Sequence, residues 1–257
     1  MFKVFVLCEL FRREKEGSFS FDDKHILLES EKSIGSGVLE SAEAGTVFSM
    51  MDYAMLMMTI SDNTASDYLF SVAGPENIRK NIIEPLELTG TKIDFNCAQL
   101  LTSYYDVTIE EYRRVLREDG RWYRRNHPYF LCEPEKNDQT SPRDMVKLLS
   151  RMYEGKLLDG DSDRRMLDIM RQCKTNARIP AKLPEGVAVA HKTGSIDHLA
   201  NDCGIVYTGN GDYVLTLFYN GNRGSVEEYE CTDWSDVGNS ILSQLSADIY
   251  EAYMQCK

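Results

Sequence analysis

The segment VAVAHKTG, residues 187–194, marks the place where the character of this 257-residue sequence changes. Its small apolar residues favour a β-strand, and two more strand-like runs follow, GIVY at 204–207 and YVLTLFY at 213–219. Between these two runs, TGNGD at 208–212 is typical of a hairpin turn. The chain before Pro180 shows mainly helical spacing of apolar residues. This order predicts an α+β fold in which an antiparallel sheet packs on a helical body.

Outward from this segment, the sequence predicts helices on both sides. Seven are expected ahead of it, at 3–16, 49–60, 64–74, 75–86, 110–118, 142–153 and 161–173. A closing helix places apolar side chains four residues apart on one stripe: Val237, Ile241, Leu245, Ile249 and Tyr253. We find no internal repeat and no low-complexity linker. The chain is therefore expected to form a single domain over 1–257, with a helical part at about 3–178 and the sheet and closing helix at about 186–256.

Composition and charge exclude several classes of protein. A net charge of −12 argues against binding to nucleic acid or to anionic membranes, and no apolar run is long enough to span a bilayer. The seven cysteines are odd in number, scattered and never arranged as C-x-x-C. This pattern fits reduced thiols better than disulfides or a zinc site, so no metal or cofactor is expected. Without a signal-peptide pattern, we expect a reducing, cytoplasmic location.

Three short motifs carry the candidate chemistry. Lys3 opens the first apolar helix, Ser61-Asp62-Asn63 follows 58 residues later, and Lys192-Thr193-Gly194 ends the first strand-like run. A serine hydroxyl becomes a nucleophile when a nearby base takes its proton, and a lysine one helical turn later serves this purpose in the pattern S-x-x-K. No lysine in the 257 residues has a serine three positions earlier. For Lys3, that position would be the one directly before Met1.

With these motifs in this order, and with GSGVL at 35–39 and TSPRDM at 140–145, the chain resembles the class A β-lactamase-like serine hydrolases of the penicillin-binding protein and β-lactamase superfamily. The resemblance covers essentially the whole length. It implies hydrolysis of a β-lactam or a related amide or ester through an acyl-enzyme. The substrate would be a small-molecule or peptide-like acyl compound.

The resemblance also implies a role for each motif residue. Lys3 would activate the serine, Ser61 would pass a proton to the leaving group, and Asn63 would orient the acyl side chain of the substrate. The edge of the first strand would hold the substrate carboxylate through Lys192, Thr193 and Gly194, and Lys192 would add positive field. The backbone N–H groups of Ser195 and of the missing serine would form the oxyanion hole.

Two departures from the family pattern stand out. The loop that carries the deacylating glutamate is shortened, so Glu133 in Glu133-Pro134-Glu135-Lys136-Asn137 is the candidate for that base. The arginine that lies on the second strand in class A enzymes has no counterpart in Asp202-Cys203-Gly204, and we expect Arg223 to replace it. Both departures leave room for a peptidase, esterase or amidase of the same mechanism.

Two functions therefore remain open. The chain is either a serine hydrolase whose nucleophile lies outside the numbered residues, or a non-catalytic descendant that binds a ligand or partner in the same pocket. The resemblance further implies that two strands preceding the serine pair with residues 213–219. Because these strands are missing from the 257 residues, the apolar edge is expected to promote self-association.

Overall fold

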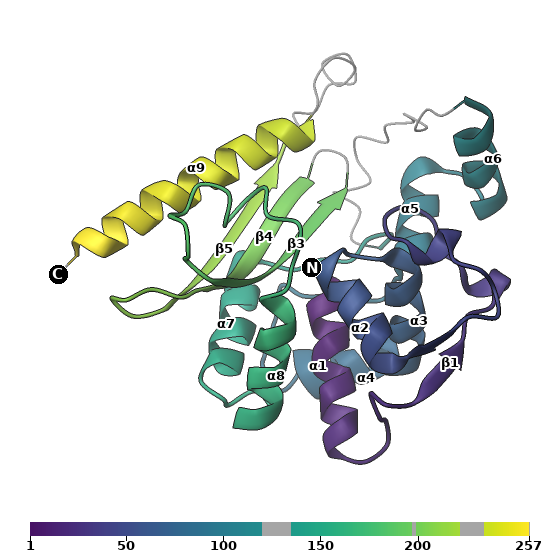
Figure 1. The fold of residues 1–257 in the computed structure, drawn as a ribbon, viewed down its shortest axis with the longest axis horizontal. Coiled ribbons are helices and arrows are strands. Elements are labelled where there is room, and N and C mark those ends of the chain that lie inside the picture. Colours follow the sequence, from purple (N-terminus) through teal and green to yellow (C-terminus); the bar gives the residue numbers. More distant parts are fainter. Residues whose placement is uncertain (120–134, 197–198, 222–233, 257) are drawn as a thin grey trace.

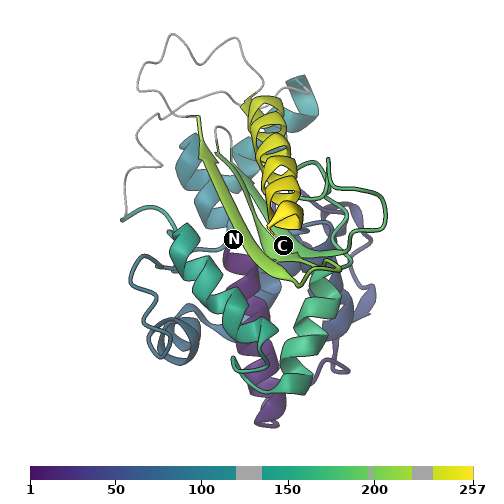
Figure 2. The same ribbon diagram turned by 90° about the vertical axis from the view of Figure 1, so that its left-hand side faces the viewer.

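A three-stranded antiparallel sheet lies between one long helix and a body of helices in the computed structural model, which describes residues 1–119, 135–196, 199–221 and 234–256 (Figure 1). The strands run in the order β3 (Val189–Ile196), β4 (Leu199–Val206) and β5 (Tyr213–Asn220). Helix α9 (Trp234–Gln255) covers one face, and α7 (Pro142–Tyr153) and α8 (Gly160–Met170) pack on the other (Figure 2). The expected α+β architecture is confirmed.

Helix α1 (Phe2–Lys15) runs through the middle of the helical body. Its residues from Phe2 to Phe11 are all buried, because apolar side chains occupy every face of this half of the helix. The remaining helices of the body are α2 (Met50–Thr59), α3 (Asn63–Ala73), α4 (Pro75–Ile78), the π-helical turn Arg79–Ile83, α5 (Cys97–Tyr105) and α6 (Ile109–Asp119). The buried start of α1 thus anchors Lys3 rigidly at the upper end of the core.

Most expected helices appear within a few residues of their expected bounds, but some elements were missed. Helix α5 lies in a stretch without a clear apolar period, where Asn96 caps the helix by accepting a hydrogen bond from the N–H of Gln99. The turn-rich segment before α2 holds two 3₁₀ turns, Glu29–Glu31 and Leu39–Ser41, and a small sheet of β1 (Lys24–Ile26) and β2 (Val47–Ser49). These three-residue strands are too short to give a period-two signal.

Strand β4 is longer than expected. The sequence suggested a strand only from Gly204, whereas β4 begins at Leu199 and pairs with β3 along its whole length. The reason is that Asn201 and Asp202 interrupt the apolar run, and Asp202 is fully buried against His191. A buried ion pair therefore takes the place of the apolar alternation by which a strand is normally recognised.

The buried face of α9 differs from the expected stripe. Ile241 and Leu245 are 45% and 43% exposed, whereas Leu242, Ser243 and Ser246 are buried. The later members of the expected stripe do reach the sheet, since Ile249 packs on the cluster around Leu215 and Leu217 and Tyr253 contacts Tyr213. The helix approaches the sheet closely at Gly238, where a Cβ atom would lie 2.5 Å from that of Ala200.

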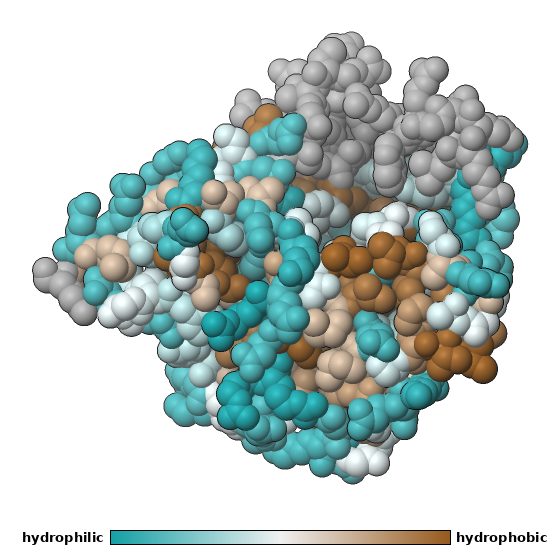
Figure 3. All heavy atoms as spheres, in the orientation of Figure 1, coloured by the Kyte–Doolittle hydropathy of each residue, from teal (hydrophilic) through white to brown (hydrophobic). Residues whose placement is uncertain are grey.

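The described surface is mostly polar, as the acidic composition requires, with an apolar patch over β1 at the right of Figure 3. Exposed side chains near this strand include Ile26, Leu28 and Val47. None of the described helices is both long and apolar enough to cross a bilayer. Within the described residues, β4 is the sole neighbour of β5, so the outer edge of β5 is open.

Candidate active site

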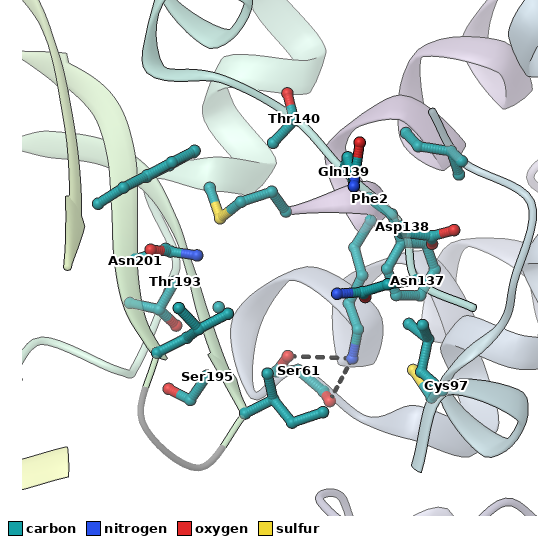
Figure 4. A pocket seen from close by; sticks show the side chains of 18 of the residues that line it. Phe2, Ser61, Cys97, Asn137, Asp138, Gln139, Thr140, Thr193, Ser195 and Asn201 are labelled. Atoms are coloured by element: carbon teal, nitrogen blue, oxygen red, sulfur yellow. Dashed lines mark hydrogen bonds between the residues drawn. The ribbon is translucent and has the colours of Figure 1, made fainter. Parts of the chain in front are cut away.

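A pocket of about 520 Å³ lies where α1, the turn before α3 and the edge strand β3 meet (Figure 4). Its walls come from segments far apart in the sequence. They include Lys3, Ser61 and Asn63 from the helical body, Thr193 to Ile196 from β3, and Asn137 to Thr140 from the segment ahead of α7. The fold thus brings all three sequence motifs to one cavity.

Lys3 lies at the centre of this site. It is only 6% exposed, and its Nζ donates to the carbonyl oxygen of Ser61 at 2.7 Å, to Ser61 Oγ at 3.0 Å and to Asn63 Oδ1 at 2.9 Å. These three acceptors account for the three protons of an ammonium group. The first turn of α1 therefore fixes the amine against the turn that carries Ser61.

Ser61 presents its hydroxyl through an unusual backbone conformation. Its φ angle is 59°, in the left-handed region that residues other than glycine rarely adopt. The carbonyl oxygen of Ser61 accepts from Lys3 and from Ser36 Oγ, at 2.9 Å for the latter, and these bonds hold the turn in place. Such strain often marks a functional position.

Lys192 reaches the same hydroxyl from the sheet. Its Nζ donates to Ser61 Oγ at 3.2 Å and to the carbonyl oxygen of Thr193 at 2.8 Å. Burial and the nearby charge of Lys3 lower the pKa of Lys192 to about 8. Burial and the charge of Lys192 likewise lower the pKa of the Met1 amine to about 6. Buried amines therefore crowd around Ser61, and each favours the neutral form of its neighbour.

Asp62, the middle residue of the serine motif, has a structural role. It is fully buried and accepts hydrogen bonds from the N–H groups of Val38 at 2.6 Å, Leu39 at 2.9 Å and Ala65 at 2.9 Å. The last of these bonds caps α3. A Cβ atom at Gly37 would lie 2.3 Å from Asp62 Oδ2, so only a glycine at this position allows the loop to approach the carboxylate.

The strand motif forms the opposite wall of the pocket. Thr193, Gly194 and Ser195 line the cavity from β3, which is the edge strand on this side of the sheet. A Cβ atom at Gly194 would lie 3.1 Å from the backbone nitrogen of Met1, so the absence of a side chain allows α1 to start against β3. As an edge strand, β3 turns unpaired backbone groups toward the pocket.

An arginine that sequence reasoning missed lies behind this wall. Arg178 is buried and donates to the carbonyl oxygens of Gly194 at 2.9 Å and Asn201 at 2.6 Å, and also to Ser195 Oγ. The second strand holds Asp202-Cys203-Gly204 where the family has its arginine, and Arg178 is an arginine beside β3 that we did not anticipate. Arg178 belongs to a segment with neither helix nor strand, and no periodic signal in the sequence marks it.

Two expected site residues lie outside the described residues. Glu133 falls in 120–134 and Arg223 in 222–233. The described part of the pocket wall contributes a different carboxylate, that of Asp138, whose Oδ1 accepts from the N–H groups of Asp94 and Phe95. Burial raises the pKa of Asp138 to about 6.

Two further observations bear on bound groups. Among the described residues, no three His, Cys, Asp or Glu side chains lie close enough together to hold a metal ion. Five cysteines in this part of the chain are free thiols, at positions 8, 97, 173, 203 and 256.

Comparisons with known proteins agree with this geometry. The sequence pattern of the Beta-lactamase enzyme family matches residues 1–253. A β-lactamase of Phocaeicola vulgatus is 27% identical over 135 residues, which make up 46% of this chain and 38% of that protein. Beta-lactamase VEB-1 of Pseudomonas aeruginosa is 23% identical over 250 residues, covering 93% of this chain and 72% of that protein. The match thus spans less than half of the first relative's length.

Solved structures share the fold. The β-lactamase from Sphaerobacter thermophilus DSM 20745 superimposes with a TM-score of 0.77 at 21% identity, covering 99% of this chain and 82% of that one. The L158E mutant of PBP-A, solved as an acyl-enzyme complex with penicillin G, gives a TM-score of 0.74 at 23% identity over 99% of this chain and 80% of that one. At these identities, the likeness establishes the fold alone.

Proposed function

Because this chain belongs to the class A β-lactamase family, we propose that its pocket serves acyl transfer from a β-lactam, or a related amide or ester, to a serine hydroxyl placed directly before Met1. The observation that supports this most directly is the pair of amines on one hydroxyl. Lys3 Nζ and Lys192 Nζ lie 3.0 Å and 3.2 Å from Ser61 Oγ. Two buried amines at one hydroxyl form a path along which a proton can travel.

The proposed reaction uses this path in two steps. Lys3, in its neutral form, takes the proton of the attacking serine, whose oxygen then bonds to the carbonyl carbon of the substrate. The C–N or C–O bond breaks, and Ser61 gives its proton to the leaving atom while it receives another from a neighbouring amine.

The opposite wall would recognise the substrate. We expect Thr193, Gly194 and Ser195 to bind its carboxylate, with Lys192 and Arg178 supplying positive charge from behind the strand. Asn63 is expected to orient the acyl side chain, since its Oδ1 is already fixed by Lys3. The N–H of Ser195 on edge strand β3 would stabilise the oxyanion. Glu133 stays the proposed deacylation base, and peptide, ester and amide substrates all fit this scheme.

The test is a chain with one serine inserted directly before Met1. Incubated with penicillin G, it should gain the mass of one acyl group, whereas the same chain with alanine at the inserted position should gain none. Intact-mass spectrometry reads both. Absence of any adduct on the serine form, with the fold verified by circular dichroism, would overturn the proposal.

A second candidate is ligand binding without turnover. The observation that favours it is the absence of a complete S-x-x-K pattern within the 257 residues. In this case, the chain would bind a carboxylate ligand reversibly in the same pocket, and inserting a serine would add no covalent step. Saturable binding of penicillin G to both forms, without an adduct on either, would distinguish this function from hydrolysis.

A further inference from the structure

A buried ion pair lies on the face of β3 opposite Lys192. His191 and Asp202 are 1% and 0% exposed, and His191 Nδ1 lies 2.9 Å from Asp202 Oδ1. His191 Nε2 lies 3.2 Å from Asn176 Oδ1. An imidazolium, which carries two N–H groups, can donate to both of these oxygens. The pair therefore joins β3 to β4 and to the segment that follows α8.

The same pair contacts both sides of Arg178. Asn176, two residues before the arginine, is bonded to His191. Ile179, the residue after it, donates its backbone N–H to Asp202 Oδ2 at 3.0 Å. This segment, residues 171–188, contains neither helix nor strand, so no ladder of backbone hydrogen bonds fixes it. Contacts with the sheet and with α9 must hold it instead.

The position of this segment determines which groups Arg178 reaches. Its guanidinium group reaches Gly194 and Asn201, which face each other across β3 and β4, and also Ser195 Oγ. On the other side, Nε donates to Asn239 Oδ1 of α9 at 2.8 Å. The planar guanidinium group can make all these bonds at once only if the backbone of Arg178 is held close to one position. The placement of residues 176–179 thus decides where the guanidinium lies.

We infer that His191 and Asp202 are positioning residues, which clamp residues 176–179 so that Arg178 supports the Gly194–Ser195 edge and the recognition of the substrate carboxylate there. The role in carboxylate recognition rests on the proposed function, whereas the positioning of Arg178 does not. Neither residue touches the pocket, since neither is among the residues that line it. Asp202 also contributes charge near Lys192, so the effect that passes through Arg178 has to be isolated in the Arg178→Lys background.

The first experiment follows Arg178 directly, without any ligand. In the 257-residue chain, the Nε–H signal of Arg178 is assigned by nuclear magnetic resonance with the help of Arg178→Lys, and its hydrogen exchange is measured. Asp202→Asn should accelerate this exchange about tenfold or more, because Ile179 and His191 lose their charged partner. His191→Gln, which keeps one donor for Asp202, should accelerate the exchange less. It replaces Asp202→Asn in this experiment if that variant does not fold.

Glu9→Gln is the matched control. Glu9 is also fully buried and is paired with Arg12 and Asn81, on a face of α1 remote from Arg178. This change should lower stability but leave the exchange of the Arg178 signal unchanged. Exchange at the wild-type rate in both Asp202→Asn and His191→Gln would overturn the positioning role.

The second experiment measures reversible binding of penicillin G to the same variants. Asp202→Asn should raise Kd about tenfold, and it should add little in the Arg178→Lys background, because both changes act through one guanidinium. Full additivity of the two changes would overturn the link between the clamp and the carboxylate. If the exchange result holds but the wild-type chain binds no penicillin G, the positioning role stands and the proposed substrate is wrong.

Discussion

Lys3 Nζ lies 3.0 Å from Ser61 Oγ, although 58 residues separate the two in the sequence. The contact arises because α1 is buried from its first turn and the turn between α2 and α3 packs against that turn. The amine also bonds to Asn63 Oδ1, so it is held by both ends of one motif. Its position is therefore a property of the core rather than of a mobile side chain.

The 257-residue chain should not hydrolyse nitrocefin and should form no acyl adduct with penicillin G. In a coupled serine hydrolase site, loss of the nucleophile lowers turnover by roughly 10⁶-fold, about 8 kcal/mol in the barrier. The measurement is absorbance for turnover and intact mass for the adduct. A stoichiometric adduct on this chain would show that a group other than the expected serine acts as nucleophile.

In the chain with serine inserted before Met1, Lys3→Ala should abolish acylation, because the hydroxyl loses its base. Glu133→Gln should leave acylation intact and slow only the release of the acyl group. Stopped-flow kinetics with nitrocefin separate the two steps. Lys15→Ala, at the exposed end of the same helix, is the control and should behave as wild type. Unchanged turnover in the Glu133 variant would assign deacylation to another group.

Asp62→Ala should lower the free energy of unfolding by about 3 kcal/mol or more. The change leaves three N–H groups, those of Val38, Leu39 and Ala65, without their charged acceptor. Urea unfolding followed by circular dichroism gives the value. Asp52→Ala removes an exposed capping carboxylate from α2 and should cost only about 1 kcal/mol. Equal losses in the two variants would contradict the structural role of Asp62.

The His191–Asp202 pair should make stability depend on pH. Burial opposes protonation of His191, but the bonds to Asp202 and Cys173 outweigh it and raise the pKa of His191 to about 9. Because the folded-state pKa exceeds the unfolded value of about 6.5, the stabilisation is complete below pH 6.5 and is lost as pH rises through 9. The difference in unfolding free energy between wild type and His191→Gln should shrink across this window.

Wild type has to be compared with His191→Gln, because other groups near His191 also titrate and change the stability. The lowered pKa values of Lys192 and the Met1 amine make stability rise with pH, opposite to the effect of His191. Cys173 is coupled to the same ring: burial raises its pKa, but the hydrogen bond from His191 brings it below the usual value. A difference that stays constant from pH 6 to pH 10 would show that His191 is neutral in the folded protein.

The open edge of β5 should make the 257-residue chain self-associate. Both faces of β5 carry apolar side chains, and among the described residues no strand pairs with its outer edge, which favours pairing with another chain. Thr216→Lys, in the middle of β5, should reduce association in sedimentation experiments over a range of concentrations. Ile241→Lys, which removes an exposed apolar side chain from α9, is the control and should leave it unchanged. A monomer at all concentrations would contradict this role of the edge.

The sequence by itself determined the class of fold and the motifs that form the two walls of the site. Helical spacing, the capping residues Ser49, Asp62 and Ser141, and the strand-like run before Lys192 are local signals, and each produced the expected element. They are readable because capping and amphipathic spacing act within one or two turns of chain. The resemblance of the motifs to the family pattern then implied that Lys3, Ser61 and Lys192 converge.

Only the tertiary structure decided which arginine supports β3, how far β4 extends and which face of α9 is buried. Arg178 carries no local signal, because its place depends on His191 and Asp202, which lie 13 and 24 positions further along the chain. The first half of β4 was missed because Asp202 occupies a buried position there and is stabilised by its ion pair with His191. The face of α9 is set by the close approach of Gly238 to Ala200. Each of these features is a contact between distant segments, and packing alone specifies such contacts.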